Sequence, residues 1–151
     1  MIDQTLTYRT MEAMIRTARL HRALCDRETA VIGIHRSQNR MLACLSRFGA
    51  LSQNALALKM QITPAVVTVT VQKLLDAGYV ERLENPADHR AYLISITPEG
   101  QEVVDKTGVI LDTVDQGVLE GFTDEDKNTL MALCQRMLDN MEHMGMKEEK
   151  A

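Results

Sequence analysis

Apolar residues recur close to the helical period along the first third of the chain. One such stretch covers residues 6–28 and breaks near Gly33. A second stretch, residues 37–48, places Met41, Leu45 and Phe48 on one face and stops at Gly49, where a glycine often ends a helix. The pattern predicts two helices, over 6–28 and 37–48.

Two short helices with a tight connection are predicted next. Ser52 is a good N-cap for a helix over 53–60. After a turn at 61–62, Thr63 supplies a cap and Pro64 fits the first helical position, so a second helix starts there and runs to about Ala77. Two short helices joined in this way form the helix-turn-helix pattern.

The period changes after Gly78. Residues 79–83 and 92–96 are rich in β-branched and aromatic side chains and partly alternate, which indicates strands. The polar, turn-prone residues 84–91 lie between them. The sequence therefore predicts a β-hairpin with a long tip, directly after the helix-turn-helix.

Two further helices are predicted after the hairpin. Thr97 and Pro98 repeat the cap-and-proline start, and the helix continues to a break at Gly121. Thr123 then caps a last helix whose apolar face reaches Met144. The small middle of the chain cannot cover the stripes of these helices and of the first one, so we expect them to pack against a second copy in a homodimer.

Charge is distributed unevenly along the chain. The net charge is −4, yet residues 33–90 hold seven Lys and Arg against four Asp and Glu, whereas residues 91–151 hold five against thirteen. A basic middle joined to an acidic C-terminal part is expected where only the middle contacts a polyanion. Chance clustering on solvated helix faces gives the same count, so charge alone does not decide between them.

Several classes of protein do not fit the composition. No run of 18 apolar residues could span a membrane, and the first residues lack the order of a secretory signal. Cys25, Cys44 and Cys134 are widely spaced, which favours reduced thiols and a cytoplasmic location; the last two lie on apolar stripes and are expected in the core. The glycine-rich, nucleophile and zinc motifs of common enzyme classes are absent, so we expect no catalytic residues and no cofactor.

A set of fragments in a fixed order resembles the MarR family of winged helix-turn-helix regulators, from about Met11 to Glu142. These fragments are residues 62–74 (beginning Ile-Thr-Pro), 78–82 (Gly-Tyr-Val-Glu-Arg), 85–90 (Asn-Pro-Ala-Asp-His-Arg) and 96–100 (Ile-Thr-Pro-Glu-Gly). The family's wing usually reads Asp-Arg-Arg, and here His89 replaces the middle arginine while Asp88 and Arg90 are kept.

The resemblance implies a mainly α fold with a small β-hairpin wing, and a function in transcription regulation. It implies a single domain in which residues 33–100 form a DNA-binding winged helix-turn-helix lobe, and 1–32 and 101–151 form dimerisation helices. A homodimer would bind a pseudo-palindromic operator on double-stranded DNA, commonly as a repressor. The family commonly binds small aromatic or amphipathic molecules between the dimerisation helices and the lobe, and no membrane partner is implied.

The helix after Thr63 is expected to enter the major groove. Val67, Val71 and Leu74 share one face and should pack inward. The residues expected to point outward, with Lys73 near the rim, are Ala65, Val66, Thr68, Val69 and Gln72. Outward valines suit thymine methyl groups, which favours an A·T-leaning site, although they could instead be core residues.

The wing and the helix starts supply the other candidate contacts. Arg90 at the hairpin tip could enter a narrow minor groove, with Asp88 holding its side chain extended; the alternative is an exposed ion pair of little consequence. Cations and helix N-termini suit phosphates. The candidates for phosphate contacts are Ser52, Thr63, Pro64 and Arg40, with Arg36, Arg47 and Lys59 as further possibilities, although Arg40 and Arg47 could be solvated surface.

Two alternatives use the same fold differently. Basic neighbours could lower the pKa of the Cys25 thiol and make a redox sensor, although an inert thiol is favoured because family sensors carry their cysteine earlier in the first helix. His21 and Cys25 are one helical turn apart, and with Glu28 and His35 they could bind zinc, but the break at Gly33 makes this the weaker interpretation and no metal ligand is predicted. A winged helix that contacts only proteins also remains open.

Overall fold

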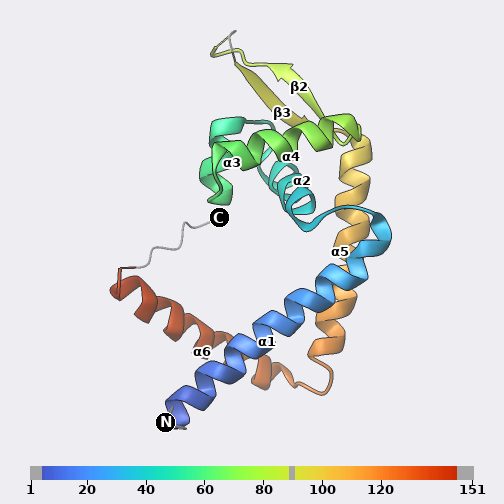
Figure 1. The fold of residues 1–151 in the computed structure, drawn as a ribbon. Coiled ribbons are helices and arrows are strands. Elements are labelled where there is room, and N and C mark those ends of the chain that lie inside the picture. Colours follow the sequence, from blue (N-terminus) through green and yellow to red (C-terminus); the bar gives the residue numbers. More distant parts are fainter. Residues whose placement is uncertain (1–4, 89–90, 146–151) are drawn as a thin grey trace. The chain divides into compact units, whose positions relative to one another are not determined.

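The computed structural model describes residues 5–88 and 91–145 (Figure 1). The chain divides into two compact units, residues 1–115 and 116–151, and the boundary falls within the last turn of helix α5. The first unit contains α1 (Leu6–Thr29), the 3-10 helix η1 (Ala30–Ile32), α2 (Arg36–Phe48), β1 (Leu51–Ser52), α3 (Gln53–Met60), α4 (Pro64–Asp76), β2 (Val80–Glu84), β3 (Tyr92–Ile96) and most of α5 (Pro98–Val118). The second unit contains α6 (Asp124–His143). The structure confirms the predicted fold, mainly α with a small β element.

Helices α3 and α4 begin where the sequence predicted. The Ser52 hydroxyl accepts a hydrogen bond from the Ala55 amide at 3.1 Å, and that of Thr63 accepts one from the Val66 amide at 3.4 Å. Between the two helices Gln61 adopts a left-handed conformation with φ of 52°. This residue ends α3 and allows the tight turn into α4.

Helix α2 begins one residue earlier than expected because of its cap. The His35 ring nitrogen Nδ1 accepts a hydrogen bond from the Ser37 amide at 3.2 Å, and the Gln38 side chain accepts one from the His35 amide at 2.9 Å. The two bonds form a reciprocal capping box that satisfies amides left open at the first turn. His35 is therefore a structural cap.

The core of the first unit lies among α2, α3, α4 and the sheet. Met41, Leu45, Leu56 and Leu74 are fully buried. Each such side chain contributes about 1.5–3 kcal/mol relative to an exposed one. Further apolar residues complete the cluster: Ile34, Leu42, Ala57, Met60, Val67, Val71, Val80, Ile94 and Val103.

The predicted hairpin is part of a three-stranded antiparallel sheet in the order β1-β3-β2. Strands β2 and β3 pair from Val80 with Ile96 to Glu84 with Tyr92. The first of them lies one residue later than predicted. Strand β1, which the sequence did not predict, pairs Leu51 with Ile94 and Ser52 with Leu93.

The second unit begins with a reciprocal cap. The Thr123 amide donates to the Asp126 carboxylate at 2.9 Å, and the Asp126 amide donates to the Thr123 hydroxyl at 3.1 Å. The Thr123 hydroxyl also donates to this carboxylate at 2.9 Å. The two bonds that the carboxylate accepts, from the Thr123 amide and hydroxyl, lower the pKa of Asp126, because they favour its charged form. No α6 side chain is buried within the chain, and Cys134 is exposed, so the expectation that Cys134 lies in the core is wrong for the single chain.

Among the described residues, no single helix is long and apolar enough to cross a membrane. Helices α3 and α4 meet the length and composition only as a pair, and they are bent by 114° to one another.

Candidate nucleic-acid interface

Helix α4 has one buried face and one exposed face, as predicted. Val67, Val71 and Leu74 are buried in the core. Thr70 is also buried. Its hydroxyl donates a hydrogen bond to the Val66 carbonyl at 2.8 Å, so this polar group is satisfied although it faces the core. All the residues expected to point outward are exposed: Ala65, Val66, Thr68, Val69, Gln72 and Lys73.

The exposed face of α4 is partly apolar. Val66 is 44% exposed and Val69 is 57% exposed, so neither is a core residue. Two of the polar side chains on this face are already engaged within the chain. The Thr68 hydroxyl lies 3.1 Å from the Gln53 side-chain oxygen of α3, and the Gln72 amide donates to Asp76 at 2.8 Å. A ligand on this face therefore meets methyl groups and pre-oriented polar groups.

Several candidate phosphate contacts lie near the starts of α3 and α4. Ser52 and Thr63 use their oxygens as helix caps, which leaves their hydroxyl hydrogens available as donors. Pro64 is exposed in the first turn of α4, and Arg40 is exposed on α2. Their contacts with phosphates stay a prediction.

The further basic candidates lie in two different surroundings. Lys59 has its Nζ atom 3.9 Å from the centre of the Phe48 ring, and the Arg47 guanidinium lies 5.2 Å from it. A cation over the face of an aromatic ring is attracted by the ring electrons, so these contacts favour positions of Lys59 and Arg47 close to Phe48. Arg36 instead lies 3.9 Å from the Asp26 carboxylate.

Backbone hydrogen bonds close the tip of the wing. The Asp88 amide donates to the Asn85 carbonyl at 3.1 Å, and the Ala91 amide donates to the Asp88 carbonyl at 3.0 Å. The Asn85 side chain accepts a further bond from the Ala87 amide at 3.0 Å. His89 and Arg90 lie outside the described residues, so the expected pairing of Asp88 with Arg90 stays a prediction.

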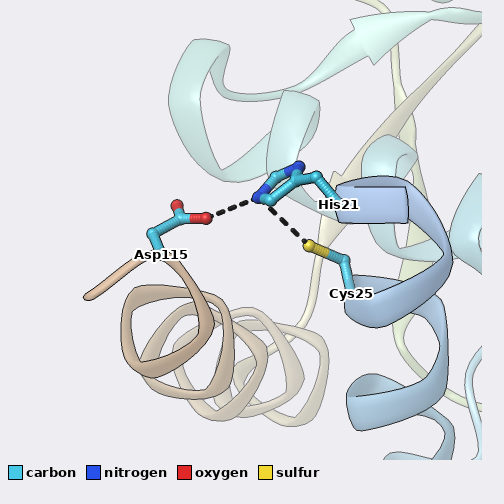
Figure 2. Close-up of side chains that lie close together, drawn as sticks. All are labelled: His21, Cys25 and Asp115. Atoms are coloured by element: carbon cyan, nitrogen blue, oxygen red, sulfur yellow. Dashed lines mark hydrogen bonds and ion pairs between the residues drawn. The ribbon is translucent and has the colours of Figure 1, made fainter. Parts of the chain in front are cut away.

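His21 and Cys25 lie side by side on α1, but Glu28 and His35 do not join them. Glu28 pairs with Arg27 at 2.6 Å, and His35 caps α2. The third member of the group is Asp115 of α5, whose Oδ1 atom lies 2.6 Å from the His21 Nε2 atom (Figure 2). Of the four zinc ligands considered from the sequence, Glu28 and His35 are therefore wrong, and His21 and Cys25 lie close together.

The Cys25 thiol is not activated by its neighbours. Burial raises its pKa, and Asp115 and Asp26 raise it further, whereas Arg36 lowers it. The net shift is upward, which agrees with the favoured interpretation of an inert thiol and contradicts the alternative of a thiol activated by basic neighbours. At neutral pH the group is a protonated thiol, which is the poorly reactive form.

A pocket of about 400 Å³ lies beside this group in the first unit. Its lining comes from α1, α2 and α5: Ala18, His21, Arg22, Cys25, Asp26, Thr29, Arg36, Asn39, Leu111 and Asp115. The sequence signals Asp115 only as one acid among thirteen in its part of the chain, so the sequence alone could not select it.

Comparisons with known proteins agree with the fold. The model of the MarR family matches residues 34–92. The HTH-type transcriptional regulator YwoH of Bacillus subtilis is 26% identical over 122 residues, which cover 81% of this chain and 88% of that protein. The HTH-type transcriptional regulator Mb0904 of Mycobacterium bovis is 35% identical over 68 residues, covering 45% of this chain but only 48% of that protein. A MarR protein from Peptoclostridium difficile has a similar structure, with a TM-score of 0.76 and 22% identity over 95% of this chain and 94% of that one.

Proposed function

The chain belongs to the MarR family of winged-helix regulators, and we propose that it binds a pseudo-palindromic operator as a homodimer and represses transcription until a small ligand releases it. It is a DNA-binding transcription regulator rather than an enzyme. Because its partner is the chromosome, we place it in the cytoplasm.

The two faces of α4 carry this proposal. A capped helix that is fixed through Val67, Val71 and Leu74 presents the opposite face at a defined angle. The major groove admits an α-helix and displays a distinct pattern for each base pair. We propose that Ala65, Val66, Thr68, Val69 and Gln72 read base edges, and that Ser52, Thr63, Pro64, Lys73 and Arg40 contact the phosphates. The wing residues Asp88 and Arg90 would follow the adjacent minor groove.

The terminal helices support the homodimer. Helix α1 buries none of its side chains within the chain. Even its apolar residues Leu6, Ile15 and Leu20 are each more than half exposed. Helix α6 also buries none, and Met131 on it is 62% exposed. Apolar stripes of this length favour a partner, and two identical readers match a two-fold symmetric site.

The pocket beside α1, α2 and α5 supports the response to a ligand. At about 400 Å³ it falls within the size range of small-molecule sites. Arg22 and Arg36 in its wall would suit the carboxylate of an aromatic or amphipathic acid, and Leu111 and Ala18 its apolar part. These residues belong to one unit, in which a dimerisation helix meets the lobe.

A selection from random duplex DNA tests the proposal. The purified full chain should enrich inverted repeats whose half-sites lie about one helical turn apart. Its affinity for the selected duplex should fall as salt rises, by roughly 0.9 in the log–log slope for each phosphate contact. A winged helix that contacts only proteins predicts no enrichment and no salt-dependent binding, and that result would overturn the proposal.

A further inference from the structure

Three side chains with metal-binding atoms converge beside the pocket (Figure 2). The Nε2 atom of His21 lies 2.6 Å from Oδ1 of Asp115 and 3.6 Å from Sγ of Cys25. All three candidate ligand atoms lie within 4.8 Å of one another. His21 and Cys25 face the same direction because they are four residues apart on α1. Asp115 approaches from α5, 94 residues further along the chain than His21.

The spacing of these atoms fits a small tetrahedral ion. Zinc bonds of about 2.0–2.3 Å place neighbouring ligand atoms about 3.5 Å apart in a tetrahedron. The observed His21–Cys25 separation of 3.6 Å already matches that edge. The His21–Asp115 pair, now a 2.6 Å hydrogen bond, would have to open by less than about 1 Å, which a side-chain rotation of the exposed carboxylate can supply.

The pocket supplies a second observation. Asn39 is one of the residues that line this pocket, and its buried Oδ1 atom has no hydrogen-bond partner among the described residues. A buried acceptor without a donor is costly. With three protein ligands a tetrahedral ion keeps one open position for water, and a water in the pocket is a donor of the kind that Asn39 lacks.

We propose that His21, Cys25 and Asp115 form a binding site for a thiophilic divalent cation, Zn²⁺ by ligand chemistry. A sulfur, a nitrogen and one carboxylate oxygen are the donors that zinc prefers, whereas Mg²⁺ and Ca²⁺ take oxygen ligands. The side chains of His21 and Asp115 are 41% and 56% exposed, so an ion can reach the site from solvent.

Binding can be written as a balanced exchange. The Cys25 S–H bond breaks, its proton leaves to solvent, and a sulfur–zinc bond forms. His21 binds as a neutral imidazole: the proton shared between Nε2 and Asp115 is lost to solvent and one is taken up at Nδ1, so this ring releases no net proton. The present hydrogen bond is then replaced by one bond from each residue to the ion. The thiolate and the carboxylate together neutralise the two positive charges of Zn²⁺. Each ion bound should therefore release about one proton from the thiol.

Titration of the metal-free full chain with Co²⁺, followed by displacement with Zn²⁺, tests the site. Cobalt bound to a thiolate gives a near-ultraviolet charge-transfer band, so we expect one ion per chain and a band that Zn²⁺ removes. Cys25→Ser should abolish the band, whereas Cys44→Ser, which changes a half-buried thiol packed against the core, should leave it unchanged. Asp115→Asn keeps the shape of an exposed side chain and should weaken Zn²⁺ binding at least about 100-fold, more than loss of an outer-shell partner.

Controls distinguish this ligand set from the one suggested by sequence spacing alone. Glu28→Gln, which changes a member of the set from sequence spacing, and His143→Gln, which changes a histidine at the end of α6, should both bind Zn²⁺ as tightly as the parent chain. No band in the parent chain, a band that survives Cys25→Ser, or equal affinity in Asp115→Asn would overturn the proposal. None of these readouts involves DNA, so failure of the metal site is distinguishable from failure of operator binding.

Discussion

Gly100 lies in the first turn of α5, close to the backbone of Tyr79. A Cβ atom at this position would collide with the Tyr79 carbonyl oxygen and press on Ile96. That carbonyl also accepts a hydrogen bond from the Thr97 amide at 3.1 Å, and the Thr97 hydroxyl donates to the Gly78 carbonyl at 2.8 Å. The start of α5 is therefore fixed closely against residues 78–79, which connect α4 to β2, and only glycine leaves room for this approach.

Replacement of Gly100 by alanine tests this contact. Because the neighbour is backbone and cannot move aside freely, we expect Gly100→Ala to lower the free energy of unfolding by about 1–3 kcal/mol. Gly108 lies in the same helix with nothing within 4 Å of its missing Cβ, so Gly108→Ala should be neutral or raise stability by up to about 1 kcal/mol. Urea unfolding of the two variants measures both. Equal stabilities would contradict the close approach.

Arg90 is the second position with a residue-scale prediction. Hydrogen bonds among Asn85, Ala87, Asp88 and Ala91 order the residues on either side of Arg90, which itself lies outside the described residues. We expect Arg90→Ala to weaken operator binding at least tenfold, or about 1.4 kcal/mol, because a guanidinium in a narrow minor groove is lost. Lys106→Ala on α5 removes an equal charge outside the lobe and should change affinity little. Gel-shift titration at fixed salt distinguishes them, and an unchanged Arg90→Ala affinity would remove the wing from the mechanism.

At the scale of elements, local signals explain what the sequence could predict. The pairs Thr63–Pro64 and Thr97–Pro98 fix helix starts by chemistry within a few residues, and the structure has helices beginning at Pro64 and Pro98. Strand β1 was missed because two residues carry no period, and its pairing with β3 depends on residues more than 40 positions away. Sequence rules alone do not select His35 as the cap of α2, because histidine is an uncommon N-cap.

The exposed valines of α4 give the element-scale prediction. Selected half-sites should lean toward A·T, since methyl groups of Val66 and Val69 suit thymine methyls and this face carries no arginine. Val69→Arg should shift selection toward guanine by about 1–3 kcal/mol of discrimination at one position. Val31→Arg, at a residue 82% exposed in η1, adds the same charge and should leave base preference unchanged. Guanine-rich half-sites from the parent chain would contradict the prediction.

At the scale of the whole molecule, the exposed apolar surface of α1 is the observation on which the proposed homodimer depends. Ile15 on α1 is 59% exposed and shares a face with Met11 and Tyr8. A charge placed there would have to be desolvated in both copies of a two-fold interface. Surfaces of this kind are recognisable from apolar periodicity, which is why the homodimer could be expected before the fold was known.

Ile15→Glu tests the dimer. We expect it to weaken self-association at least tenfold, corresponding to 1.4 kcal/mol, and to weaken operator binding with it. Leu58→Glu changes an apolar side chain that is 69% exposed on α3, in the lobe, and should leave the dimer intact. Sedimentation across a concentration series measures both variants. A parent chain that sediments as a monomer at all concentrations would remove the dimer from the account.

The candidate metal site shows where sequence reasoning ends at this scale. His21 and Cys25 are visible as a helical pair because four residues separate them. Asp115 enters only through the packing of α5 against α1, and no spacing rule connects residues 94 positions apart. The sequence therefore suggested a plausible pair and then completed it with Glu28 and His35, which are near in sequence but engaged elsewhere.

Ser52 belongs to two elements at once, because it ends β1 and caps α3. The edge strand of the sheet and the first turn of α3 are therefore joined with no residue between them. Because β1 pairs with β3 of the wing, we expect a movement of the wing to reach α3 and, through the packing of α3 on α4, the proposed reading helix. Under the proposed function, the wing and α4 of each copy would then leave the operator together.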